Sequence, residues 1–130
     1  AAGTGRFLEM VAERLGTNLD GLGDLAARAE APAPVSSMCV VFAETEIIGL
    51  LASGKQPADI VAGVQRAIAS RVAGMLGREV VAPVVFTGGV AMVPGMAGAI
   101  AEVIGSDVRV APEPQMSGAL GAAVLACREA

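Results

Sequence analysis

Histidine is absent from this sequence, as are tryptophan and tyrosine, and the aromatic side chains are limited to three phenylalanines. Without an imidazole, the chain has no serine–histidine–aspartate triad, no cysteine–histidine dyad and no histidine metal ligand. Lysine and arginine total 9 against 13 aspartates and glutamates, which gives a formal net charge of −4. An acidic chain with so few aromatics lacks the basic patch and the stacking platform that nucleic-acid binding needs. We therefore expect no nucleic-acid partner.

Cysteine is scarce as well. Two cysteines in 130 residues do not make a disulfide framework, and this usage is typical of a cytoplasmic protein. The sequence opens with alanine rather than methionine and with no secretory signal, so we expect a trimmed or excised piece. The uncharged stretch 80–101 has the length of a membrane span. Its two prolines and four glycines would break a spanning helix, and we expect no membrane association.

What remains is an aliphatic chain that is 54% hydrophobic and long enough for one domain over residues 1–130. Apolar residues recur at helical spacing in six segments, each bounded by glycine, proline or a capping residue. Helices are expected over 6–15, 19–29, a segment capped by Ser36 or Ser37 and closed by Gly54, 57–77, 94–105 and 115–129. Glu44 and Glu46 fall in the early turns expected for the third of these helices, where they would complement its dipole.

Two short apolar runs predict β-strands. Residues 83–86 form a buried strand that ends at a glycine turn, and residues 108–110 form a second strand. The helix expected between them implies that the strands are parallel and joined by a right-handed crossover. The fold class is therefore α/β.

The glycine turn is the first candidate site. Residues 87–91 read Thr-Gly-Gly-Val-Ala. Paired glycines after a buried strand let the backbone approach a ligand closely, and ligands of open α/β sheets bind beyond the carboxyl ends of the strands. A tight turn without a ligand is the alternative. Gly88, Gly89 and Val90 are the residues that would contact a ligand.

A second glycine pair stands at the beginning of the first helix, where Gly3, Thr4 and Gly5 are consecutive. The unpaired amides at a helix start attract anions. The alternative is a simple helix cap in which Thr4 is the N-cap residue.

Cysteine and small residues supply the remaining candidates. Cys39 follows two serines and precedes an acidic helix, and a thiolate near a helix N-terminus is stabilised by its amides. A buried, inert thiol is the alternative, and it is also the default interpretation of Cys127. Residues 118–123, Gly-Ala-Leu-Gly-Ala-Ala, give the last helix a bare face suited to close helix packing.

These motifs occur in an order that resembles one family. The matching runs are 1–9, 36–46, 68–72, 87–91 and 118–122. Together they resemble the ATPase activators of 2-hydroxyacyl-CoA dehydratases and the related benzoyl-CoA reductase subunits, the BadF/BadG/BcrA/BcrD type. The resemblance covers essentially the whole chain but only about the C-terminal half of such a protein.

The resemblance implies the actin/Hsp70/sugar-kinase fold, with this chain as part of the second of two α/β domains and with ATP or ADP and Mg²⁺ in the cleft between them. It implies dimers of like or homologous subunits that share one [4Fe–4S] cluster, with two cysteines from each subunit. Cys39 matches the second of these ligands, and residues 87–91 match the adenosine motif. Residues 118–123 match the closing helix beside the hinge. The partners would be an acyl-CoA dehydratase or reductase component and an electron donor such as ferredoxin or flavodoxin.

The departures from the family pattern predict a fragment. The first cluster cysteine would stand directly before Ala1, and the two acidic phosphate motifs and three further strands would also precede it. We expect the isolated chain to be inactive as an ATPase. Two other interpretations stay open: a sugar or acyl kinase domain without a cluster, and a structural dimerisation fragment without a ligand.

Overall fold

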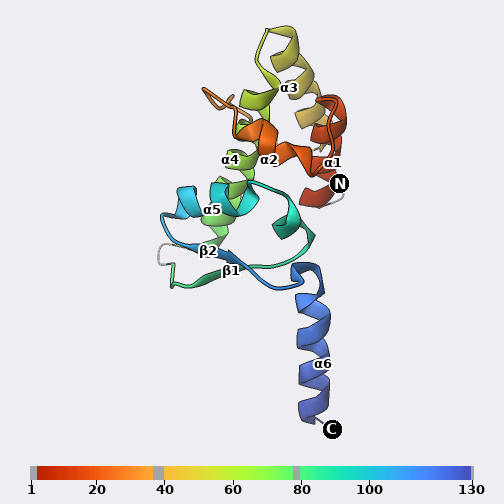
Figure 1. Cartoon of the computed structure of the whole chain (residues 1–130), viewed down its shortest axis with the longest axis vertical. Helices are drawn as coiled ribbons and strands as arrows, with labels where there is room; N and C mark the ends of the chain where they lie inside the picture. The colour runs from red at the N-terminus through yellow and green to blue at the C-terminus, as the bar shows by residue number, and fades with distance from the viewer. Residues whose placement is uncertain (1–2, 37–39, 78–79, 130) are drawn as a thin grey trace.

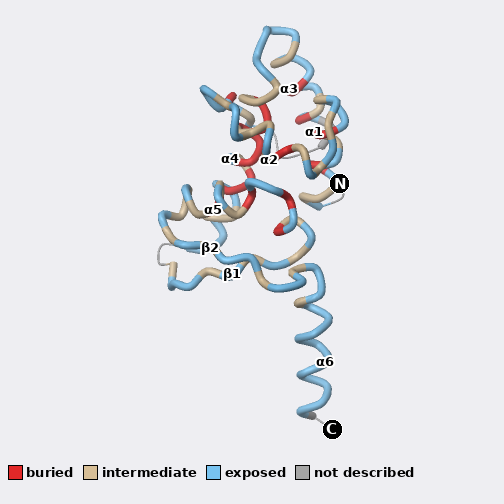
Figure 2. The backbone as a smooth tube through the Cα atoms, viewed as in Figure 1, coloured by how far each residue is buried: buried red, intermediate tan, exposed pale blue. Residues whose placement is uncertain are grey.

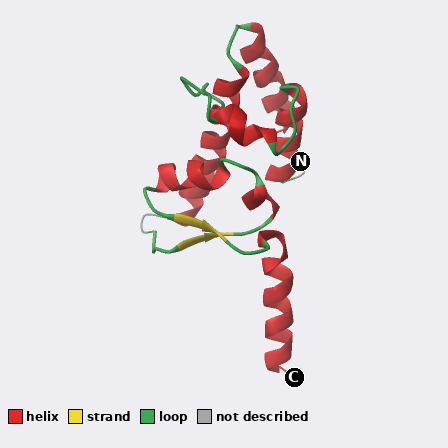
Figure 3. Ribbon diagram, viewed as in Figure 1, coloured by secondary structure: helices red, strands yellow, loops and turns green. Residues whose placement is uncertain are grey.

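A computed structural model of the chain describes residues 3–36, 40–77 and 80–129. Most of this part is helical, with two short strands (Figure 3). The α-helices are α1 (Thr4–Arg14), α2 (Gly21–Ala26), α3 (Val40–Ala52), α4 (Pro57–Leu76), α5 (Met96–Ile104) and α6 (Ser117–Glu129). The strands are β1 (Val84–Phe86) and β2 (Val108–Val110), and two single-turn 3₁₀ helices are η1 (Gly89–Met92) and η2 (Pro114–Met116).

The long helix α4 is the centre of the fold. It packs against α2, α3 and α5, while α1 packs against α3 (Figure 1). Pro57 occupies the first turn of α4, where its missing amide removes no hydrogen bond. The apolar stripe predicted for this helix is confirmed at Ile60, Val61, Val64 and Ile68.

The core is mostly aliphatic and lies between α1, α2, α3, α4 and α5, and Figure 2 shows the buried residues concentrated there. Close packing of such side chains is what holds helices of this length in place. The large side chains that are almost completely buried are Phe7, Leu8, Val11, Leu22, Ile47, Ile60, Val61, Val64, Met96 and Ile100.

The two strands form a parallel pair, as the strand–helix–strand order predicts. Val84 lies opposite Val108, and Phe86 lies opposite Val110. The glycine turn follows Phe86 at the carboxyl end of β1, and α5 packs against β2. The sheet therefore presents the glycine turn at its end.

Most helix boundaries differ from the sequence-based expectations by one or two residues, and the first three helices differ in ways that matter. α1 begins at Thr4 with Gly3 as its N-cap, so the assignment of Thr4 as N-cap is wrong. α2 is shorter than 19–29, because Gly21 and Gly23 weaken its first turn. Ser36 does not cap α3. Its amide and hydroxyl both donate to a carboxylate oxygen of Glu46 at 2.9 Å.

Ser37 lies outside the described residues. The first described turn of α3 holds no acidic residue, and Glu44 and Glu46 come directly after it. Glu44 instead pairs with Arg14 of α1, whose Nε donates to Glu44 Oε1 at 2.8 Å. This pair links two helices that are far apart in the sequence.

Candidate functional site

The glycine turn after β1 has a backbone conformation that favours glycine. Gly88 has a φ of +89° and a ψ of 171°, a region that L side chains rarely adopt. A Cβ at Gly89 would meet no atom within 4 Å, so the space beside this residue is open. The backbone at Gly89 is therefore accessible to a ligand.

Hydrogen bonds fix the start of this turn. The Gly88 amide donates to the Pro114 carbonyl oxygen at 2.7 Å, and the Ala91 amide donates to the Gly88 oxygen at 3.1 Å. The chain then enters η1, a 3₁₀ helix that the sequence did not predict. The amides of Gly89 and Val90 belong to the first turn of η1, where no intrahelical acceptor exists. They are free to donate to a bound group.

The start of α1 lies near this turn. α1 contacts η1, and the N-terminal end of α1 is its nearer end in Figure 1. Gly3 caps α1 without a side-chain hydrogen bond, and the helix has no acidic residue in its first turn. A Cβ at Gly3 or Gly5 would also meet no atom within 4 Å. The structure thus brings the two predicted glycine sites to the same side of the molecule.

The segment before α6 also lies against the glycine turn. η2 contacts η1, and the residue before it, Glu113, has a left-handed φ of +44°. α6 then leads away from the rest of the molecule (Figure 1). Residues 118–123 do not pack against another helix in this structure: all six are exposed, and no atom lies within 4 Å of a Cβ at Gly118 or Gly121.

The predicted metal ligand Cys39 lies outside the described residues. The other cysteine, Cys127, is exposed near the end of α6. Over 3–36, 40–77 and 80–129, no group of three or more potential metal-binding side chains comes together. This part of the chain does not supply the ligand set of a [4Fe–4S] cluster, which takes four thiolates. In the same ranges, no helix combines the length and apolarity of a membrane span.

One polar residue was missed by the sequence analysis. Gln65 of α4 is buried, and its Nε2 donates to the Pro94 carbonyl oxygen at 3.0 Å. Its position was a signal, because Gln65 interrupts the buried face of α4 between Val61 and Ile68. Pro94 directly follows Val93, the C-cap of η1, so Gln65 acts close to the glycine turn.

Comparison with known proteins gives the same family that the motifs suggest. Residues 1–126 match the model of the BadF/BadG/BcrA/BcrD ATPase family. The (R)-2-hydroxyglutaryl-CoA dehydratase activating ATPase of Acidaminococcus fermentans is 44% identical over all of this chain and 50% of its own length. The activator of lactoyl-CoA dehydratase of Anaerotignum propionicum is 49% identical over 97% of this chain and 49% of its own length.

A solved structure agrees with these relatives. The activator of the 2-hydroxyisocaproyl-CoA dehydratase from Clostridium difficile, with bound ADPNP, superposes with a TM-score of 0.86 at 40% identity. The superposition covers 99% of this chain and 48% of that one. Fold and glycine turn therefore define a helix-rich α/β lobe of the actin/Hsp70/sugar-kinase type.

Within that class, the chain belongs to the BadF/BadG/BcrA/BcrD ATPase family. It spans about half the length of the curated relatives that it matches.

Proposed function

We propose that this chain is the nucleotide-binding lobe of an ATP-dependent activator of an acyl-CoA dehydratase or reductase component. The observation that carries the proposal is the open backbone at the Gly88–Val90 turn, in a family whose relatives include a structure with bound ADPNP. Gly88, Gly89 and Val90 would contact the adenosine of ATP or ADP, and Gly3, Thr4 and Gly5 would border the cleft. Residues 1–130 act as a single domain in this proposal.

The residues present fit the adenosine end of a nucleotide. Two free amides and an open approach suit a neutral, hydrogen-bonding ligand that lies against the backbone. The phosphate end of the nucleotide requires different groups, because phosphoryl transfer needs carboxylates that hold Mg²⁺. The family's acidic phosphate motifs are not among these 130 residues. We propose that groups other than these residues hold Mg²⁺ and the phosphates.

The electron-transfer part of the proposal rests on the family resemblance. The assembled protein would be a dimer of like or homologous subunits with a shared [4Fe–4S] cluster, located in the cytoplasm. Cys39 would supply one thiolate from each subunit. In the sequence, Cys39 stands directly before Val40, the first described residue of α3. When bound, the cluster would supply a low-potential electron, received from ferredoxin or flavodoxin.

Isothermal titration calorimetry with ADP tests the nucleotide site. The wild-type chain is expected to bind ADP, and Gly89→Val is expected to abolish binding because its side chain fills the open approach. Gly49→Val is the matched control, since Gly49 is an exposed residue of α3 with no atom within 4 Å of a Cβ. Absence of ADP binding by the wild-type chain, or equal binding by Gly89→Val, would refute this site.

A different measurement distinguishes the activator proposal from the cluster-free kinase alternative. Iron and sulfide analysis of the intact, anaerobically prepared protein should find iron if the activator proposal is right. Nucleotide binding without iron would favour the kinase-like alternative.

A further inference from the structure

Pro94, which follows the C-cap residue of η1, is contacted by two helices. From α4, Gln65 Nε2 donates to the Pro94 carbonyl oxygen at 3.0 Å. From α2, Gly23 lies directly against the Pro94 ring and backbone. Because Val93 caps η1 and α5 begins at Met96, these contacts act at the junction between the glycine turn and the next helix.

Gln65 is 4% exposed and is the one buried polar side chain in the described ranges. Burial of a carboxamide is unfavourable unless its hydrogen bonds are made, so the bond to Pro94 is needed at this position. The side chain also contacts Gly95, which has a φ of +89°. A Cβ at Gly95 would lie 2.7 Å from Gln65 Oε1. The carboxamide therefore leaves no room for a side chain at Gly95.

Gly23 makes the second contact, and it can approach Pro94 this closely because it has no side chain. A Cβ at this position would lie 2.4 Å from Pro94 Cβ and 3.0 Å from the Pro94 carbonyl carbon. Ring and backbone atoms cannot rotate away as the end of a flexible side chain can. A methyl group at Gly23 must therefore displace Pro94 or α2.

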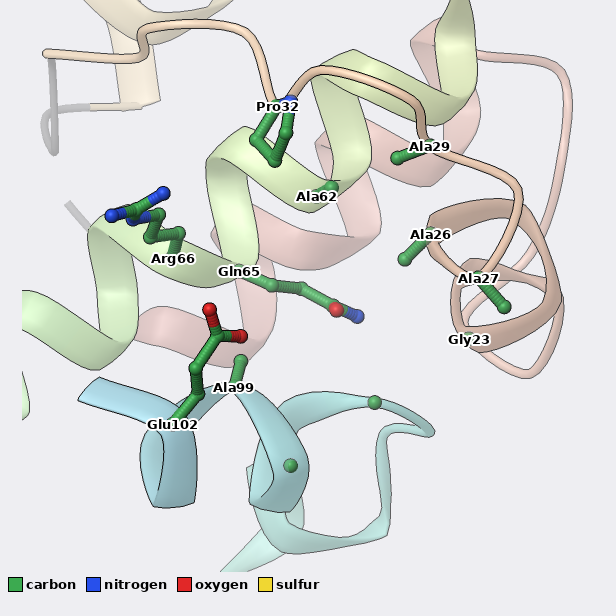
Figure 4. A pocket seen from close by; sticks show the side chains of 12 residues that line it. Gly23, Ala26, Ala27, Ala29, Pro32, Ala62, Gln65, Arg66, Ala99 and Glu102 are labelled. Carbon is green, nitrogen blue, oxygen red and sulfur yellow. The ribbon is translucent and has the colours of Figure 1, made fainter. Parts of the chain in front are cut away.

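The two contacts come from opposite sides of one small cavity of about 340 Å³. Figure 4 shows Gln65 extending from α4 towards Gly23 of α2 and Ala27, the C-cap of that helix. Ala26, Ala27 and Ala99 are among the small residues that line this cavity. Pro94 therefore receives a hydrogen bond from α4 and a close backbone contact from α2.

We propose that Gln65 and Gly23 are positioning residues for nucleotide binding, and we name the pair with Pro94 the Pro94 clamp. The other end of the turn is fixed by the hydrogen bond from the Gly88 amide to the Pro114 oxygen. With both ends fixed, the free amides of Gly89 and Val90 keep one orientation towards the cleft. The inference rests on the proposed nucleotide site, whose contacts these two residues do not make themselves.

The experiment compares two variants with two matched controls. Gln65→Met removes the hydrogen bond and keeps the length of the side chain, and Gly23→Ala adds one methyl group. Gln56→Met is the control for the first, because Gln56 is exposed and makes no side-chain cap bond on the same helix. Gly49→Ala is the control for the second, because the space beside Gly49 is open.

Three quantities are measured on each chain: ADP affinity by calorimetry, hydrogen–deuterium exchange of the peptide 87–96 without nucleotide, and the melting temperature by circular dichroism. For Gln65→Met, we expect about tenfold weaker ADP affinity, as loss of one buried hydrogen bond predicts. For Gly23→Ala, we expect weaker affinity as well, because the added methyl group displaces Pro94 or α2. We expect faster exchange of the peptide 87–96 at a temperature where the variants remain folded. Both controls should match the wild type in affinity and exchange.

The possible results separate the two proposals. If the wild-type chain does not bind ADP, the nucleotide site is refuted and the clamp is refuted with it. If the wild type binds ADP and the clamp variants bind it equally well, the nucleotide site stands and the clamp is refuted. A lower melting temperature with unchanged affinity belongs to this second result, because it shows a structural role alone.

Discussion

The sharpest stability prediction concerns Gly63, where α4 crosses the segment that follows α2. A Cβ at Gly63 would lie 2.0 Å from the Ala33 carbonyl oxygen and 3.0 Å from the Ala33 carbonyl carbon. Both are backbone atoms of a buried residue, so relief requires the segment to move by about 1 Å. Such a shift would also weaken or break the hydrogen bond from the Ala33 amide to the Asp59 carbonyl oxygen, which is 2.8 Å long.

The expected change in the free energy of unfolding for Gly63→Ala has three contributions. Overpacking costs about 1–3 kcal/mol. Loss of the Ala33 hydrogen bond adds about 1 kcal/mol. The better helix propensity of alanine offsets about 1 kcal/mol. The free energy of unfolding should therefore fall by about 2 kcal/mol, and the melting temperature by roughly 8 °C.

Urea unfolding followed by far-UV circular dichroism measures this change, since the chain has no tryptophan or tyrosine for fluorescence. The control is Gly74→Ala in the same helix, where a Cβ meets no atom within 4 Å. That variant should be as stable as the wild type or more stable by about 0.5 kcal/mol. A Gly63→Ala chain that is no less stable than Gly74→Ala would refute the crossing of α4 and residue 33.

Four further predictions follow from the same structure. Asp59→Ala should lower the free energy of unfolding by about 2 kcal/mol in urea, because a carboxylate oxygen accepts the amides of Glu30 and Ala31 at 2.9 Å; an unchanged midpoint would contradict it. The isolated chain should show no Mg²⁺-dependent ATP hydrolysis in a phosphate-release assay, and turnover that Gly89→Val abolishes would overturn this. Anaerobic reconstitution should leave no stable [4Fe–4S] cluster, and about four irons per dimer, lost in Cys39→Ser, would show otherwise. The chain should self-associate in sedimentation experiments, and a monodisperse monomer over a wide concentration range would disprove this.

The helices and the parallel strands were predictable because their signals are local. Apolar spacing and a proline at the first position of α4 define that helix, and its buried face follows from the same spacing. The glycine turn was predictable because a short apolar run and two glycines are adjacent in the sequence, although Val85 of that strand is exposed rather than buried. Its continuation into η1 was not, because a single 3₁₀ turn has no periodicity to detect.

Features that depend on distant partners were not predictable from one sequence. The acidic residues of α3 were assigned to its dipole, but Glu44 pairs with Arg14 and Glu46 binds Ser36. These partners lie 30 and 10 residues away. The buried Gln65 depends on Pro94, which lies 29 residues along the chain. The partners of these polar side chains are set by the tertiary structure, and local sequence patterns carry no information about it.

The chain exposes more surface than a compact monomer of its mass. A compact monomer of 12.9 kDa exposes about 6,300 Å², whereas this chain exposes 7897 Å². The excess of roughly 1,600 Å² is larger than the share that one partner buries in a standard interface, about 800 Å².

Exposed apolar side chains on α6 and on the adjacent sheet contribute to this excess surface. Leu120 is 67% exposed and Leu125 is 60% exposed, and with Met116 they line an apolar hollow at the start of α6. Val85 and Val110 are also exposed on the two-stranded sheet, which has few strands for independent stability. Water contact with so much apolar surface favours association, and a net charge of −4 opposes it only weakly. If Leu120→Glu and Leu125→Glu leave the sedimentation coefficient unchanged, the association does not use α6; if they convert an oligomer to a monomer, the exposed face of α6 is the interface.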